Sequence, residues 1–255
     1  MRSLNADDWN KPTLAKLWTV KDIAAHILDT HIRTISLARD KHVLIPDRQI
    51  NSYESLVDYL NRLNADWVAA AKRISPPVLI ELLELTGEQG AAYFETVDLM
   101  ADATFSVAWA GEEKSTNWFH IARELTEKWH HQQQIRDAVG KPGIMTREFF
   151  HPVIATFLRG LPHTYRNTIA PEGTSVKITI AREIGGDWYL VRNHERWELT
   201  DKPATTHAAT ITIPPDVAWK LFTKGITRQE AEKTVTITGD QQLAGVTLTL
   251  LAVMA

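Results

Sequence analysis

The sequence of 255 residues contains no cysteine. Disulfide bonds, thiolate metal ligands and a catalytic cysteine are therefore excluded, and any bound metal must be held by His, Asp or Glu. Any thiol chemistry must use a thiol supplied from outside the chain. The sequence also has no apolar stretch near the roughly 20 residues that a membrane-spanning helix needs. We therefore expect no membrane partner.

Positive charge is not in excess either. The 28 Lys and Arg residues stand against 31 Asp and Glu residues, and no basic run stands out. Non-specific nucleic-acid binding needs clustered positive charge that displaces counterions, so we expect no nucleic-acid partner. The first residues, MRSLNADDWNK, contain no apolar core of signal-peptide length. We expect a cytoplasmic protein that is a monomer or a homodimer.

The hydrophobic pattern changes along the chain. From Leu14 to about Arg166, apolar residues recur every three or four positions, which is typical of helices. From Ser175 onward, short alternating segments are separated by Gly and Pro, which indicates strands. We predict a two-domain α+β protein, with a four-helix bundle in residues 1–145 and an α+β domain with a mainly antiparallel sheet in residues 146–255.

Start and stop signals define the predicted helices of the first half. Thr19 and Asp22 form a possible capping box at the start of the first helix. The next helix should end before Pro76-Pro77. The helices after the first are predicted over residues 53–74, 90–108, 118–139 and 148–166. In the helix over 118–139, four apolar residues share a face that should point into the bundle: Trp118, Ile121, Leu125 and Trp129.

The second half should combine strands with short helices. Strands are predicted over residues 176–180, 188–191, 197–199, 210–213 and 235–238. Pro214-Pro215-Asp216 should open a short helix with Asp216 as its N-cap, and a last helix is predicted over 241–254. Three tryptophans raise the hypothesis that this half carries an apolar ligand, although aromatic residues in such a domain ordinarily fill its core: Trp188, Trp197 and Trp219.

A polar stripe in the helix over 118–139 holds candidate metal ligands. Its members are spaced by four, three, four and three residues: His120, Glu124, Glu127, His131 and Gln134. Glu127 and His131 can reach a common point, because residues four apart lie one above the other on a helix. A Glu–His pair of this spacing is also common on solvated surfaces, and His130 could pair with Glu127 instead. On the first helix, geometry predicts that His31 is more buried than His26, and does not decide which of them binds metal.

Two stretches resemble the signature stretches of the mycothiol-dependent maleylpyruvate isomerase family: LWTVKDIAAHILD (17–29) and ARELTEKWHHQQQIRDAVG (122–140). The resemblance extends over nearly the whole chain and includes WAGEE at 109–113. It implies a DinB-like four-helix bundle followed by a sterol-carrier-like α+β domain. It also implies that His26, Glu127 and His131 bind a divalent metal ion. Zinc is the first expectation for this ligand set, with nickel, manganese and iron as alternatives.

The resemblance also implies an activity. Three protein ligands leave a coordination position open, as in catalytic sites, and a thiol bound there would lose its proton. We therefore expect an isomerase or S-transferase that acts on a small electrophilic or unsaturated substrate, with a low-molecular-weight thiol such as mycothiol as co-substrate. In that chemistry a thiolate adds to the substrate, allows bond rotation and leaves.

Two other functions stay open. The chain could be a metal-binding module without catalysis, which a fourth ligand such as His130 would favour, or a carrier of a small apolar ligand through its second half.

Two departures from the family also have consequences. Many relatives have Asp where this chain has Gln134, which predicts the loss of a carboxylate that supports a ligand. The chain starts close to the first stretch, so we expect part of the first helix to be absent or the start to lie late.

Overall fold

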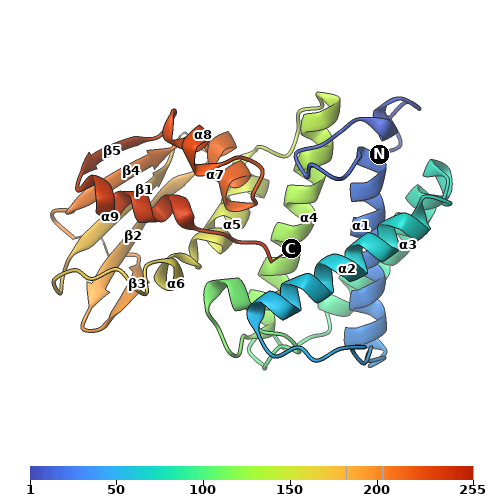
Figure 1. Ribbon diagram of the computed structural model, residues 1–255, viewed down its shortest axis with the longest axis horizontal. Helices are drawn as coiled ribbons and strands as arrows, with labels where there is room; N and C mark the ends of the chain where they lie inside the picture. The colour runs from blue at the N-terminus through green and yellow to red at the C-terminus, as the bar shows by residue number, and fades with distance from the viewer. Residues whose placement is uncertain (182, 203, 255) are drawn as a thin grey trace. The chain divides into compact units, whose positions relative to one another are not determined.

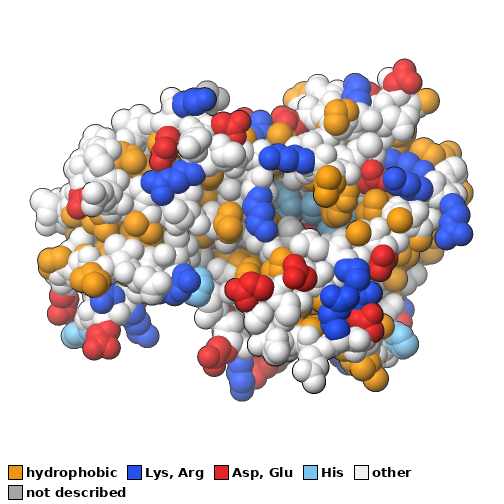
Figure 2. Space-filling model, in the orientation of Figure 1, with side chains coloured by type: hydrophobic (Ala, Val, Ile, Leu, Met, Phe, Trp, Pro, Cys, Tyr) orange, Lys and Arg blue, Asp and Glu red, His pale blue; other side chains and the backbone are white. Residues whose placement is uncertain are grey.

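The computed structural model describes residues 1–181, 183–202 and 204–254, and its chain separates into two compact units (Figure 1). The first unit comprises residues 1–104 and 131–142, and the second comprises residues 105–130 and 143–254. The predicted domain limits, 1–145 and 146–255, stay a prediction. Within the described residues, no helix combines the length and the apolar character needed to cross a bilayer. On the face shown in Figure 2, side chains of both charge signs are interspersed.

The first helix begins where its capping signals predict. The Thr19 side chain accepts a hydrogen bond from the Asp22 backbone N–H, and the Asp22 carboxylate accepts one from the Thr19 backbone N–H. The predicted capping box is therefore confirmed. A short 3-10 helix, η1 (Asp8–Asn10), precedes α1 (Val20–Arg33), and a π-helical segment, η2 (Thr34–Arg39), follows it.

The next two helices differ from the prediction. Helix α2 (Tyr53–Ala71) is slightly shorter than predicted, and α3 (Pro76–Phe94) begins at the prolines that were predicted only as a stop. Proline suits the first helical turn because the N–H that it lacks has no partner there within the helix. The predicted helix over 90–108 is wrong beyond Phe94: the chain there is irregular up to η3 (Ala108–Ala110).

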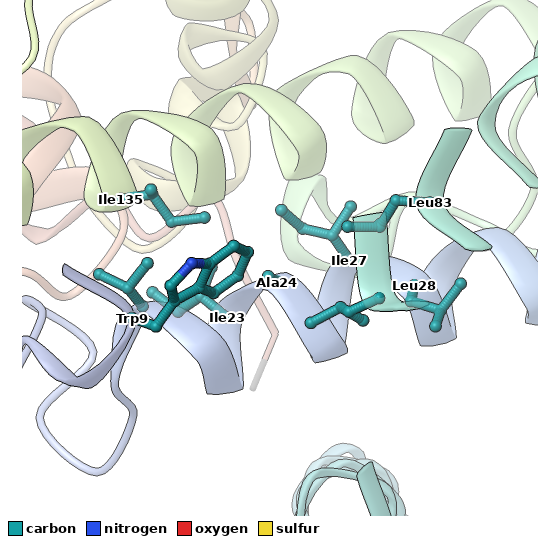
Figure 3. Packing of buried hydrophobic residues seen from close by; sticks show 9 residues of the cluster. Trp9, Ile23, Ala24, Ile27, Leu28, Leu83 and Ile135 are labelled. Carbon is teal, nitrogen blue, oxygen red and sulfur yellow. The ribbon is translucent and has the colours of Figure 1, made fainter. Parts of the chain in front are cut away.

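The core of the first unit is made by apolar side chains of α1, α3 and α4 (Asn117–Val139) together with Trp9 (Figure 3). Ile23 and Ile27 of α1 are buried with Leu83 of α3 and Ile135 of α4. Burying each such aliphatic side chain stabilises the fold by about 1.5–3 kcal/mol. Because Ile135 lies one helical turn after His131, this core also fixes the His131 segment against α1.

The apolar face of α4 is enclosed only in part: Trp129 is 4% exposed, as predicted, but the prediction is wrong for Trp118 and Leu125. Trp118 is 44% exposed and Leu125 is 43% exposed, whereas Glu124 and His131 are each only 7% exposed. The Trp118 ring lies 5.0 Å from the Arg159 guanidinium carbon, a cation–π contact that suits a partly exposed indole. The polar stripe is therefore the more buried side of the helix. Periodicity separates two helix faces, but it does not say which of them is enclosed.

The second unit contains a sheet with the strand order β3-β2-β1-β4-β5. Neighbouring strands are antiparallel except β1 and β4, which are parallel, so the predicted mainly antiparallel sheet is confirmed. Val176, Ile178 and Ile180 of β1 share its buried face. The strands are β1 (Ser175–Ile180), β2 (Gly186–Asn193), β3 (Arg196–Thr200), β4 (Ala209–Ile213) and β5 (Thr236–Gly239).

Short helices complete the second unit. The helix predicted over 148–166 is two helices, which a turn at Arg159 and Gly160 separates. The helix predicted over 241–254 ends at Gly245 and is followed by a 3-10 turn. Their bounds are α5 (Arg147–Leu158), α6 (Leu161–Thr164), α7 (Pro215–Phe222), α8 (Arg228–Glu232), α9 (Gln241–Gly245) and η4 (Val246–Thr249).

Asp216 does not cap α7 as predicted. The N-cap is Pro214, and the Asp216 carboxylate instead accepts hydrogen bonds from Trp219 Nε1 at 3.1 Å and Lys220 Nζ at 2.8 Å. Trp219 and Trp197 are almost completely buried, with exposed fractions of 0% and 2%. Both tryptophans therefore pack inside the second unit, as core residues do.

Candidate metal centre

His26 lies in the middle of α1 and is 4% exposed. His31 is half-buried and contacts Thr86 of α3, with 3.2 Å between His31 Nδ1 and Thr86 Oγ1. The prediction that His31 is the more buried histidine is therefore wrong. The reason lies in the neighbours: His31 faces α3 beside Gly87, which has no side chain to cover it, whereas His26 is packed against other rings.

The three predicted ligands lie together. One ligand atom from each of His26, Glu127 and His131 can be chosen so that all of them lie within 4.8 Å of one another. Glu127 and His131 come from successive turns of α4, as their spacing predicts. The His26 and His131 rings meet edge to face, with 4.7 Å between their centroids. Two imidazoles and a carboxylate at this separation have the composition of a divalent-metal site.

Gln134 orients His131. The amide Oε1 of Gln134 lies 2.9 Å from His131 Nδ1, and Gln134 is only 3% exposed. Because an amide oxygen can only accept, Nδ1 carries the hydrogen, which leaves Nε2 with the lone pair that a metal ion needs. The amide oxygen of Gln134 thus occupies the supporting position beside this candidate ligand.

His130 is held differently from its neighbour. Its Nδ1 lies 2.9 Å from the backbone carbonyl oxygen of Thr126, and the side chain is 4% exposed. His130 does not belong to the group formed by His26, Glu127 and His131 among the described residues. This hydrogen bond to the preceding helical turn gives the buried Nδ1 atom a polar partner, as buried polar atoms require.

The earlier members of the polar stripe form an ion cluster of their own. Burial raises the pKa of Glu124, but Arg123, Lys128 and His120 outweigh it and lower that pKa to about 2. Glu124 forms ion pairs with Arg123 and with Lys128, whose Nζ lies 3.0 Å from Glu124 Oε2. Burial and the charge of Arg123 lower the pKa of His120. Glu124 is therefore an anion already surrounded by cations.

Asp29 lies one turn after His26 on α1 and is 9% exposed. Burial raises its pKa, against the opposing effects of Arg33 and His26. Arg33 Nε lies 3.0 Å from Asp29 Oδ2, and Arg33 Nη2 lies 3.3 Å from the Asn64 side-chain oxygen on α2. This network links the His26 helix to α2.

Trp18 is a residue of the candidate centre that the sequence pattern did not indicate. Its ring centroid lies 4.8 Å from that of His26 and 6.2 Å from that of His131, so it borders both imidazoles. The available signal was its place directly before Thr19, the residue that caps the helix carrying His26. Sequence spacing cannot show that a residue before a helix folds back along it.

Comparison with known proteins places the chain in a family. The family model described as "Mycothiol maleylpyruvate isomerase N-terminal domain" matches residues 1–136. A solved structure of a mutant mycothiol-dependent maleylpyruvate isomerase has the same fold: the TM-score is 0.50 with 11% identity, over 86% of this chain and 79% of that chain. A ubiquinone synthesis protein, UbiJ-SCP2, overlaps 38% of this chain and 91% of that chain, with 15% identity and a TM-score of only 0.26. A search of curated proteins finds no match. Because its family model spans more than half of the 255 residues, the chain belongs to the mycothiol maleylpyruvate isomerase N-terminal domain family.

Proposed function

We propose that this protein binds a divalent metal ion through His26, Glu127 and His131 and catalyses a thiol-dependent reaction on a small unsaturated or electrophilic substrate. The reaction class is an isomerisation of the maleylpyruvate type, or an S-transfer. The observation that carries the proposal is the placement of the three ligand atoms within 4.8 Å of one another in a chain of this family. Zinc suits two imidazoles and one carboxylate, with nickel, manganese and iron as alternatives.

When bound, the metal ion would stabilise the thiolate form of an incoming thiol. The chain supplies the rest of the centre: His26 and His131 present imidazole nitrogens, and the contact of Gln134 Oε1 with His131 Nδ1 leaves Nε2 of His131 available. Because the chain has no cysteine, the thiol must come from solution, and mycothiol is the thiol that the family name indicates. We place the reaction in the cytoplasm, where small thiols are kept reduced.

Activity assays with and without zinc, and with and without the thiol, test the proposal. Protein stripped with a chelator and reloaded with zinc should isomerise maleylpyruvate in the presence of mycothiol, and omission of either zinc or the thiol should abolish turnover. His131→Ala should be inactive, whereas His31→Ala, a matched histidine outside the ligand group, should keep its activity. Absence of thiol-dependent turnover by the wild-type protein across several thiols and electrophiles would overturn the catalytic part of the proposal.

The two alternatives predict different outcomes. A metal-binding module without catalysis would retain the metal but show no thiol-dependent turnover. A carrier of an apolar ligand would need space inside the second unit, where Trp197 and Trp219 instead contribute buried core packing. We therefore rank the carrier function last.

A further inference from the structure

Trp18 contacts both histidines of the candidate centre. Its ring is tilted by 40° to His26 and by 39° to His131, at centroid separations of 4.8 Å and 6.2 Å. The two imidazoles also meet each other at 4.7 Å. These three rings therefore form one cluster, in which each imidazole has the other imidazole and the indole as neighbours.

The backbone delivers Trp18 to this position. The carbonyl oxygen of Trp18 accepts hydrogen bonds from the backbone N–H and the hydroxyl of Thr13, at 3.2 Å and 2.8 Å, and its N–H donates to Ala15 at 2.6 Å. Pro12 and Thr19 form an isolated antiparallel bridge that closes the same segment. The indole is half-buried and packs against the core that contains Ile23 and Ile135. Backbone hydrogen bonds therefore fix the Trp18 main chain, and contact with the core restrains its indole ring.

Metal ligands need this kind of restraint. The torsion that turns an imidazole about its bond to Cβ is broad and twofold, so a histidine ring must be fixed by its surroundings. Loss of a residue that orients metal ligands from outside the coordination shell typically lowers metal affinity by about 10- to 100-fold.

We infer that Trp18 is a positioning residue of the metal centre, which holds the ring planes of His26 and His131 for coordination. The inference rests on the proposed metal site. It assigns a role in the centre to a residue that donates no ligand atom.

Cobalt and zinc binding test the inference without an activity assay. The test variants are Trp18→Ala and Trp18→Phe, and the control is Trp67→Ala. Trp67 of α2 packs against the same core, and its Nε1–H donates a hydrogen bond to the Ala25 carbonyl oxygen at 2.8 Å. Zinc affinity is measured by chelator competition, and the visible absorption band of bound Co²⁺ reports the coordination geometry. Thermal unfolding is recorded for each variant.

We expect Trp18→Ala to weaken zinc binding by roughly 10-fold or more, as is usual when a residue that orients ligands is lost. Its cobalt band should also change, and Trp18→Phe should restore both properties. Trp67→Ala should lower the melting temperature but leave the zinc affinity and the cobalt band unchanged. If Trp18→Ala does not fold, Trp18→Leu takes its place in the comparison with Trp18→Phe.

Each contrary outcome has a distinct meaning. Unchanged zinc affinity and an unchanged cobalt band in Trp18→Ala would overturn the positioning role and leave the metal site standing. A loss of affinity of the same size in Trp67→Ala would also overturn it, because the effect would then follow stability alone. If the wild-type protein binds neither metal, the proposed function and this inference both fall.

Discussion

At the scale of single residues, the tautomer of His131 depends on Gln134. The amide oxygen accepts from Nδ1 at 2.9 Å inside a buried environment, so the hydrogen bond has little competition from water. A histidine that can switch tautomer would present Nε2 to a metal ion only part of the time. The choice of amide or carboxylate at position 134 should therefore affect the affinity of the proposed metal site.

Replacing Gln134 with an apolar residue should weaken metal binding. We expect Gln134→Leu to raise the zinc dissociation constant by roughly 10-fold, the usual cost of losing such a supporting partner. Gln134→Glu should bind zinc at least as tightly as the wild type, because a carboxylate is a stronger acceptor for Nδ1–H. Chelator competition at neutral pH measures both. Equal affinity in Gln134→Leu and the wild type would show that the hydrogen bond does not matter.

Glu124 should make stability depend on pH. Its ordinary pKa of 4.5 falls to about 2 in the folded protein, because nearby cations outweigh the effect of burial. A lowered folded pKa means that the carboxylate stabilises the fold above pH 4.5, and that this contribution disappears as the pH falls from 4.5 towards 2. The contribution at neutral pH is about 3 kcal/mol.

Urea unfolding at several pH values tests this effect. Glu124→Gln should be less stable than the wild type at pH 7 and should lose less stability on acidification, so the two curves converge at low pH. The exposed Glu113 offers a matched control, and Glu113→Gln should follow the wild type. Parallel pH profiles for Glu124→Gln and the wild type would contradict the assignment.

At the scale of elements, α4 exposes only part of its apolar face, and this predicts unequal costs of truncation. Leu125 is 43% exposed, whereas Phe119 on the same helix is 2% exposed. Leu125→Ala should change the unfolding free energy by about 0.5 kcal/mol or less, because Leu and Ala are both good helix formers. Phe119→Ala should cost about 3–5 kcal/mol. A large loss in Leu125→Ala, measured by urea unfolding, would mean that this face is enclosed.

Elements differed in how well the sequence predicted them. The capping box at Thr19 and Asp22 places the start of α1 because the signal and the structure are both local. Alternating residues such as Ile178 place the strands for the same reason. Pro76-Pro77 misled the prediction, because two prolines fit equally well after one helix and in the first turn of the next. The direction in which α4 buries a face depends on tertiary contacts, which periodicity does not contain.

The candidate centre was predictable only in part, for a related reason. Helical spacing brings Glu127 and His131 together within α4, and this needs no tertiary information. Nothing in the spacing connects either of them to His26, more than a hundred residues earlier, and helical geometry favoured His31 as the buried histidine. The family resemblance supplied that connection. Neither route pointed to Trp18, because its role depends on how the chain folds back before α1.

At the scale of the whole molecule, the centre joins two helices from distant parts of the chain, so metal binding should stabilise the folded state. A ligand that binds only the folded protein stabilises it by about 2.7 kcal/mol at one hundred times its dissociation constant. Zinc should therefore raise the midpoint of thermal unfolding of stripped wild-type protein. Glu127→Gln should show a much smaller rise, whereas His31→Ala should respond like the wild type. No zinc-dependent rise in the wild type would contradict the site.

The central claim is that His26, Glu127 and His131 together hold one metal ion. Elemental analysis of protein purified without added metal, compared with a His131→Ala variant prepared in the same way, tests it most directly. We expect about one divalent ion per wild-type chain, as a single site with three protein ligands requires, and a strong loss of metal in the variant. Equal metal content in the two proteins would contradict it.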